Sequence, residues 1–146
     1  MAERKANAEW NGGLKDGSGR IAVGSGVFEG RLSFATRFED EPGTNPEELL
    51  GASLAGCYAM ALNAALEKGG TPASNVKVEA KVFLGKDDSG FKINRIDLET
   101  TADVPGMSQE DFAKAAEETK KGCPISKALA ATDITLKASL AKSAGA

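Results

Sequence analysis

Histidine is absent from the 146-residue chain, and cysteine occurs only twice, at Cys57 and Cys123. Without an imidazole, the chain cannot build a Ser–His or Cys–His nucleophile pair or a histidine-containing metal site. Two thiolates are too few for a four-cysteine zinc or iron–sulfur site within one chain. A phosphate-binding loop is missing too, and Gly24, Gly26 and Gly30 do not match a dinucleotide fingerprint. We therefore expect no metal and no organic cofactor.

Long basic runs are also missing and the net charge is −3, so nucleic acid is not an expected partner. The first residues are polar and lack an apolar signal segment, which predicts a cytoplasmic location.

With 41% hydrophobic and 27% charged residues, the chain is expected to form one globular domain over residues 1–146. Leu49 to Leu66 is uncharged over 18 residues, but its many alanines favour a core helix over a membrane span.

The first part of the chain is predicted to form antiparallel strands. Apolar alternation over Ala6–Trp10 leads into the turn signal Asn11–Gly13, and a second extended segment covers about Arg20–Gly24. Alternation at Leu32, Phe34 and Thr36 then predicts a third strand that ends near Arg37.

A long helix is predicted from Pro46 to about Lys68. Asn45 can cap it, Pro46 suits the first helical position, and Gly69-Gly70 can end it. Because this helix is apolar on almost all sides, we expect it at the centre of the fold. A homodimer would cover the apolar surface that one small chain leaves exposed.

The second half of the chain is predicted to continue with a hairpin. Residues 76–84 alternate, Asp87–Gly90 closes the hairpin, and a shift of apolar parity predicts a β-bulge near Asn94–Arg95. Two further helices and a last strand, Ile134–Leu140, are expected to follow. The predicted class is α+β, with a mainly antiparallel sheet and a long buried central helix.

The two cysteines lie 66 residues apart, which excludes a Cys-x-x-Cys oxidoreductase. The position of Cys57 among small, apolar residues is typical of a buried, unreactive thiol unless a cation lies nearby. Cys123 precedes Pro124 at a predicted helix start, where backbone N–H groups stabilise a thiolate. Cys123 is therefore the better candidate for a low pKa, with an inert cap residue as the alternative. A nucleophile with a separate resolving thiol is a further interpretation of the pair.

Four segments carry the strongest pattern: TRFE at 36–39, GTNPEELLGA at 43–52, AGC at 55–57 and GCPIS at 122–126. Together they resemble the osmotically inducible protein C and organic hydroperoxide resistance family. The match extends from Trp10 to about Leu140, and the two cysteine motifs at this spacing make it specific. The first two segments look more like the osmotically inducible branch of the family.

The resemblance implies an intertwined homodimer with two active sites at the subunit interface. It implies that Cys57 is the peroxidatic thiol and Cys123 the resolving thiol. It also maps the family's arginine onto Arg37 and its glutamate onto Glu47. Taken alone, Arg37 is a charge at a strand end, and Glu47 is an acidic residue that complements the helix dipole.

The arginine has two alternative positions, Arg20 and Arg31, because the branches of the family differ in the loop before the helix. Helix geometry adds an expectation about the glutamate. On one straight helix, Glu47 and Cys57 would lie ~15 Å apart along the axis. We therefore expect either a break near Gly51 or Gly56, or an approach of Arg37 and Glu47 from the partner chain, and we favour the partner chain.

The predicted function is a thiol peroxidase that reduces organic hydroperoxides to alcohols as a defence against oxidative stress. Cys57 attacks the hydroperoxide, its sulfenic acid condenses with Cys123 to a disulfide, and an external dithiol reductant restores both thiols. Arg37 stabilises the thiolate, and Glu47 holds Arg37 in place. Leu, Met and Phe side chains around the helix are expected to favour organic hydroperoxides over hydrogen peroxide.

The alternatives are non-catalytic. The same apolar dimer cleft could serve a redox sensor or a small-molecule-binding domain, and a structural domain would carry two inert thiols. Turnover of hydroperoxide with a dithiol separates the enzyme from the sensor, which reacts about once, and slow, equal alkylation of both thiols identifies the structural domain.

Overall fold

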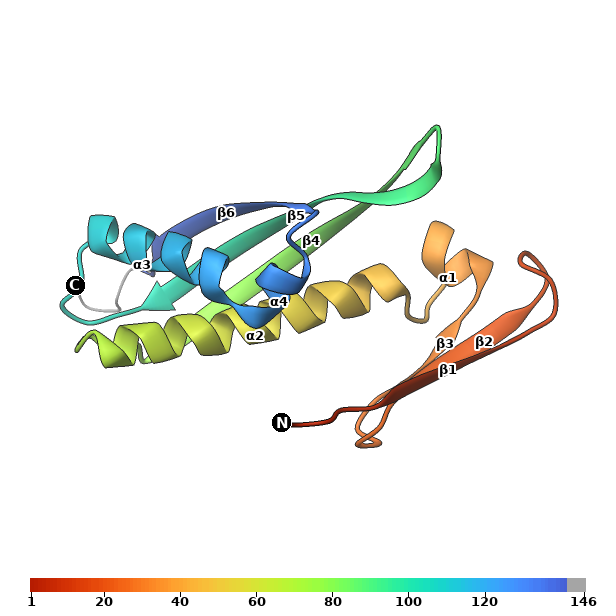
Figure 1. Cartoon of the computed structure of the whole chain (residues 1–146), viewed down its shortest axis with the longest axis horizontal. Coiled ribbons are helices and arrows are strands. Elements are labelled where there is room, and N and C mark those ends of the chain that lie inside the picture. The colour runs from red at the N-terminus through yellow and green to blue at the C-terminus, as the bar shows by residue number, and fades with distance from the viewer. Residues whose placement is uncertain (142–146) are drawn as a thin grey trace. The chain divides into compact units, whose positions relative to one another are not determined.

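The computed structural model describes residues 1–141, which form two compact units, Met1–Leu49 and a second unit that begins at Leu50. Each unit has its own three-stranded sheet, and Figure 1 shows the N-terminal sheet in red to orange and the other in green to blue. The α+β class is confirmed, while the single domain over 1–146 stays a prediction.

The first unit contains an antiparallel meander of three strands. Its strands are β1 (Ala6–Asn11), β2 (Ser18–Val23) and β3 (Glu29–Leu32), in the order β1-β2-β3. Gly12 and Gly26 have φ angles of 93° and 81° in the two connections, a left-handed conformation that glycine adopts without steric cost. The first two predicted strands are confirmed.

The third predicted strand is wrong beyond Leu32, because a short helix, α1 (Phe34–Phe38), follows it. Ser33 and Thr36 form a reciprocal cap: the Thr36 N–H donates to Ser33 Oγ over 3.1 Å, and the Ser33 N–H donates to Thr36 Oγ1 over 2.9 Å. This cap satisfies backbone groups that a strand would leave for a neighbour, so it outweighs the apolar alternation. Arg37 consequently lies in the last turn of a helix rather than at a strand end.

Helix α2 (Pro46–Lys68) has the predicted bounds. Asn45 caps it, since its Oδ1 accepts a hydrogen bond of 2.7 Å from the Glu48 N–H. Gly70, with φ of 87°, follows its end. The helix runs without interruption, so the alternative in which it breaks near Gly51 or Gly56 is wrong.

The second unit pairs a long hairpin with a returning strand. β4 (Asn75–Asp87) and β5 (Gly90–Asp103) are antiparallel, whereas β6 (Asp133–Leu140) runs parallel to β5. The parallel pair needs a crossover connection, and α3 (Gln109–Gly122) and α4 (Pro124–Ala128) provide it. In Figure 1, the helices of this unit lie along one face of its sheet.

The predicted β-bulge in the hairpin is confirmed. Phe83 pairs with Arg95 while the next residue, Leu84, pairs with Ile93, which leaves Asn94 as the extra residue of β5. The bulge restores the inward direction of the apolar side chains on both sides of it.

The core of the second unit lies between α2 and the sheet. A stripe of α2 side chains with helical spacing is fully buried: Leu54, Tyr58, Leu62 and Leu66. They belong to one cluster with Ile96, Leu98 and Ala102 of β5 and Phe112 of α3. The Tyr58 hydroxyl donates a hydrogen bond of 2.9 Å to the Ala116 carbonyl of α3, which satisfies its polar end inside the core.

The other apolar side chains of α2 are not fully buried within the chain, and Met60 on another side is 76% exposed. By length and composition alone, α2 is the one helix among the described residues that could cross a membrane. Its buried stripe belongs to one apolar cluster with β5 and α3, as in the core helix of a folded domain. The exposed apolar side chains leave surface on α2 that a further protein surface could cover.

Candidate active site

The structure brings the two cysteines together. Cys57 lies in the middle of α2 and Cys123 is the N-cap residue of α4, and their Sγ atoms lie 2.9 Å apart in a thiol–thiol hydrogen bond. Both are free thiols. A disulfide forms only between two cysteines whose sulfur atoms come this close together. The two thiols are therefore positioned for reversible oxidation to a disulfide.

The surroundings of the two thiols differ. Cys57 is partly exposed, whereas Cys123 is only 1% exposed. Burial raises the pKa of Cys57, and the hydrogen bond shared with Cys123 raises it further. At Cys123 burial opposes ionisation too, but the adjacent Cys57 thiol and the N–H groups of Ser126 and Ile125 outweigh it, so the pKa of Cys123 is lowered. The sequence-based ranking of Cys123 as the lower-pKa thiol agrees with these directions.

A second pair of predicted residues meets in the first unit. The Arg37 guanidinium donates hydrogen bonds of 2.7 Å and 3.2 Å to Glu47 Oε1 and one of 3.3 Å to Oε2. Glu47 is 8% exposed, and a buried carboxylate requires such a partner. The alternative arginines pair elsewhere, Arg20 with Glu29 and Arg31 with Glu41.

An apolar pocket of about 260 Å³ lies beside Arg37 in the same unit. The centroids of the Phe34 and Phe38 rings lie 4.9 Å apart with the ring planes tilted by 43°, and the Arg37 guanidinium carbon lies 5.3 Å from the Phe38 ring centroid. The pocket is lined by Trp10, Leu14, Leu32, Ser33, Phe34, Arg37, Phe38 and Pro46. The apolar residues of this pocket are Trp, Leu, Phe and Pro, and the predicted pocket of Leu, Met and Phe side chains around the long helix stays a prediction.

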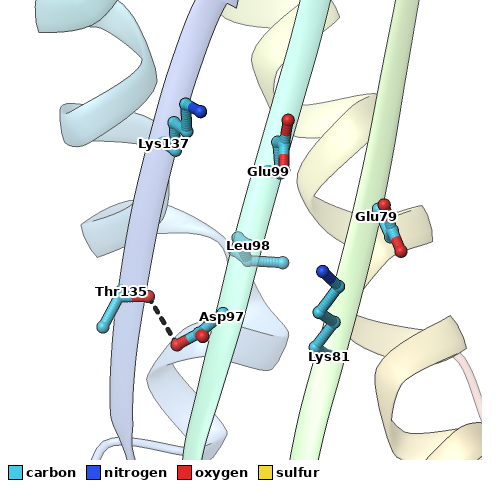
Figure 2. Close-up of a pocket in the computed structure, with 7 residues that line it drawn as sticks. All are labelled: Glu79, Lys81, Asp97, Leu98, Glu99, Thr135 and Lys137. Carbon is cyan, nitrogen blue, oxygen red and sulfur yellow. Dashed lines mark hydrogen bonds between the residues drawn. The ribbon is translucent and has the colours of Figure 1, made fainter.

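A second depression, on the outer face of the sheet of β4, β5 and β6, differs in character. Its volume is about 190 Å³, and charged side chains of both signs line it. Figure 2 shows Lys81 and Asp97 on neighbouring strands and the Thr135 hydroxyl, which donates a hydrogen bond of 2.7 Å to Asp97 Oδ1. Such cross-strand polar pairs are typical of a solvated sheet face, and no thiol lines the depression.

The four predicted site residues therefore form two pairs, Arg37 with Glu47 and Cys57 with Cys123. Each pair lies inside one compact unit. Among the described residues 1–141, no group of three or more Cys, Asp or Glu side chains could hold a metal ion.

Sequence reasoning missed three features. It gave no role to Trp10 or Leu14 of the apolar pocket. These two residues are far in sequence from the other residues that line the pocket, and no common pattern connects them. It missed the hydrogen bond of Tyr58 to α3. It also gave no role to Ser126, although that residue stands in the quoted segment 122–126.

Comparisons with known proteins identify the family to which the chain is related. The family model described as OsmC-like protein matches residues 38–138. Peroxiredoxin OsmC of Escherichia coli (strain K12) is 42% identical over 134 residues, which cover 91% of this chain and 93% of that protein. The organic hydroperoxide resistance protein OhrB of Bacillus subtilis (strain 168) is 32% identical over 76% of this chain and 81% of its own.

Solved structures show the same fold. The crystal structure of OhrB of Bacillus subtilis aligns with a TM-score of 0.73 and 27% identity, over 92% of this chain and 98% of that chain. The OsmC-like protein from Mycoplasma pneumoniae aligns with a TM-score of 0.75 over 97% of this chain and 99% of that chain, at 18% identity. With its long helix, its two sheets and a family match that includes both cysteines, this chain belongs to the OsmC-like protein family.

Proposed function

We propose that this protein is a thiol peroxidase that reduces organic hydroperoxides to alcohols, as a defence against oxidative stress. The observation that carries the proposal is the contact between Cys57 Sγ and Cys123 Sγ at 2.9 Å, with one thiol partly exposed and the other buried. The names of the relatives, peroxiredoxin and organic hydroperoxide resistance protein, support the same class of reaction.

In the proposed first step, Cys57 acts as the nucleophile because it is the more accessible sulfur. Its thiolate attacks the terminal oxygen of the hydroperoxide, the O–O bond breaks, and the alkoxide leaves as the alcohol after taking up a proton. Cys57 becomes a sulfenic acid. The Cys123 thiolate then attacks the Cys57 sulfur, forms the disulfide and expels the hydroxyl group as water after protonation.

Ionisation of Cys57 needs help, because burial and the neighbouring thiol raise its pKa. We propose that the guanidinium of Arg37 supplies it and also stabilises the charge that develops on the peroxide oxygens. Glu47 fixes the guanidinium through the forked contact described above. Both residues are positioning or electrostatic groups that accept no proton in this scheme.

We further propose that Arg37 and Glu47 act on Cys57 of the partner subunit in a homodimer. The continuity of α2 supports this, since Glu47 and Cys57 on one unbroken helix lie ~15 Å apart along the axis. Met60, exposed on α2, is one of the apolar side chains that a second copy would cover.

The pocket beside Arg37 supports an organic rather than an inorganic peroxide as substrate. Its aromatic and aliphatic lining would bind the alkyl or aryl group while the guanidinium faces the peroxide oxygens. An external dithiol is proposed to reduce the disulfide, and a cytoplasmic location, where such reductants are present, fits this requirement.

The test is turnover of cumene hydroperoxide with dithiothreitol. The wild-type protein is expected to consume many equivalents, Cys57→Ser none, and Cys123→Ser is expected to accumulate a sulfenic acid that dimedone traps on Cys57. Consumption of about one equivalent followed by arrest in the presence of the dithiol would contradict the enzyme and indicate a redox sensor.

A further inference from the structure

Ser126 carries a buried hydroxyl without a formed hydrogen bond. Its side chain is 7% exposed, and its Oγ is the only buried side-chain nitrogen or oxygen atom in the described residues 1–141 that lacks a hydrogen-bond partner. A buried polar group that lost its water contacts without gaining a partner is destabilising, and it requires an explanation.

The position of Ser126 relates it to Cys123. Ser126 is the third residue after Cys123 and lies in the five-residue helix α4 that begins at Pro124. The backbone groups of Cys123 are already used, because its N–H donates to the Thr119 carbonyl and its carbonyl accepts from the Lys127 N–H. The Cys123 sulfur is the remaining acceptor on this residue.

Ionisation makes the Cys123 sulfur a stronger hydrogen-bond acceptor. A thiol sulfur accepts hydrogen bonds weakly, whereas a thiolate is a charged acceptor. The Ser126 hydroxyl and N–H both act to lower the pKa of Cys123. The hydroxyl is thus poorly satisfied beside the thiol and well satisfied beside the thiolate.

The Ile125 N–H also faces the Cys123 sulfur, but the other side chains that face it do not replace the Ser126 hydroxyl. Cys57 on α2 faces it as a thiol, Tyr58 on α2 points its hydroxyl to the Ala116 carbonyl, and Glu118 of α3 lines the groove that reaches Cys123. Once Cys57 is oxidised, it no longer provides a thiol proton, and Ser126 remains as a side-chain donor to the Cys123 sulfur.

We propose that Ser126 is a positioning residue for disulfide formation: its hydroxyl donates a hydrogen bond to the Cys123 thiolate and holds that sulfur as the nucleophile facing Cys57. This inference rests on the proposed peroxidase function. In the assisted step the Cys123–Cys57 S–S bond forms, the S–O bond of the sulfenic acid breaks, and the hydroxide takes up a proton to become water. The sulfenic acid is the oxidant, so no further co-reactant is needed.

The same hydrogen bond operates in the reverse direction. When the thiolate of an external dithiol attacks Cys57 Sγ of the disulfide, Cys123 leaves as a thiolate that Ser126 stabilises. A better leaving thiolate departs faster. Ser126 therefore directs the reductant to Cys57 rather than to the buried Cys123.

The test compares Ser126→Ala with the wild type and with Thr119→Val. Thr119 is a matched control, since it is also 7% exposed and close to Cys123 in sequence, but its hydroxyl donates to the Ala115 carbonyl. After one equivalent of cumene hydroperoxide, rapid acid quench and mass spectrometry follow the sulfenic acid and the disulfide separately. Ser126→Ala is expected to slow disulfide closure about 10-fold at pH 7, to leave sulfenic acid formation unchanged and to increase Cys57 sulfinic acid. Ser126→Thr, which keeps the hydroxyl, is expected to restore closure, and Thr119→Val to leave it unchanged.

Two further measurements make the outcome decisive. In a Cys57→Ser background, the pKa of Cys123 read from the pH dependence of iodoacetamide alkylation is expected to rise by about one unit in Ser126→Ala. This pKa measurement needs no peroxidase activity, so failure of the proposed function is distinguishable from failure of this inference.

The second measurement is the stability of the variant. Because the hydroxyl lacks a partner in the reduced protein, Ser126→Ala should unfold at an unchanged or higher urea concentration. An unchanged closure rate and Cys123 pKa, or a large loss of stability, would overturn the inference.

Discussion

The side chains of Arg37 and Glu47 meet through three hydrogen bonds, although Arg37 lies in the last turn of α1 and Glu47 in the first turn of α2. The carboxylate is nearly buried while the guanidinium keeps 38% of its side-chain surface exposed. Glu47 thus anchors an arginine whose charge stays available to a ligand, which is the arrangement that recognition of a polar, reacting group requires.

Replacement of this arginine by lysine should separate geometry from charge. Arg37→Lys keeps the positive charge but loses the forked contact with Glu47, so the rate of Cys57 oxidation by cumene hydroperoxide should fall about 10- to 100-fold. Stopped-flow measurement of the single-turnover rate tests this. Arg20→Lys, at an arginine paired with Glu29 on an exposed face, is the control and should react like the wild type; an equal loss in both variants would contradict a specific role for Arg37.

Mixing of two inactive variants tests whether the site is shared between subunits. Arg37→Ala and Cys57→Ser should each be inactive as homodimers. After joint refolding, about a quarter of the wild-type activity should return, because half of the dimers are mixed and each mixed dimer contains one intact composite site.

A second mixture provides the negative control, in which no subunit can complete the cysteine pair. Cys57 and Cys123 of one chain are already in contact, so Cys57→Ser mixed with Cys123→Ser should not recover disulfide formation. Absence of recovery in the first mixture, with mixed dimers demonstrated by native mass spectrometry, would place Arg37 and Cys57 of one active site in the same subunit.

The aromatic pocket should determine the preference among hydroperoxides. Phe34→Ala removes one of the two neighbouring rings, and the KM for cumene hydroperoxide should rise about 10-fold, with little change in the rate with hydrogen peroxide. Steady-state kinetics on both substrates provide the measurement. Phe91→Ala, in β5 and outside the pocket lining, should leave both substrates unaffected, and a parallel loss on both substrates in Phe34→Ala would argue against a binding role.

The buried tyrosine should give the stability a specific dependence on alkaline pH. Burial raises the pKa of Tyr58 above its ordinary value, whereas in the unfolded chain the phenol ionises near pH 10. Stability from this group is therefore complete below pH 10 and is lost as the pH rises, since only the unfolded chain releases the proton.

Urea unfolding of the wild type and Tyr58→Phe at pH 8 and pH 10.5 tests this dependence. At pH 8 the variant should lose about 1 kcal/mol, because the hydrogen bond to the Ala116 carbonyl disappears. At pH 10.5 the difference should shrink, since the variant lacks the ionising phenol. A constant difference at both pH values would contradict the assignment.

Local signals in the sequence determine the parts of this fold that could be predicted. Asn45, Pro46 and Gly69 define the ends of α2 because capping depends on neighbouring residues only. The Asn94 bulge was predictable because a change of apolar parity records it directly. The alternation of Phe34 with Leu32 predicts a strand because it carries no information about the cap between Ser33 and Thr36.

The site was predictable in its residues and less so in its environment. The motif segments indicated Cys57, Cys123, Arg37 and Glu47, and the structure gives each cysteine a contact and each charge a partner. The lack of a partner for Ser126 depends on the burial of a single oxygen, which arises from tertiary packing. No spacing or composition of the sequence could reveal it.

The parallel pairing of β6 with β5 has a consequence for how the chain matures. Residues 104–132 must close a long loop before the two strands align, and contacts of such high sequence separation form late in folding. Cys123 lies in this connection, between α3 and α4, so its contact with Cys57 requires the connection to pack against α2. During synthesis on the ribosome, Cys57 therefore exists first as a solitary thiol, and the dithiol pair arises together with the completed topology.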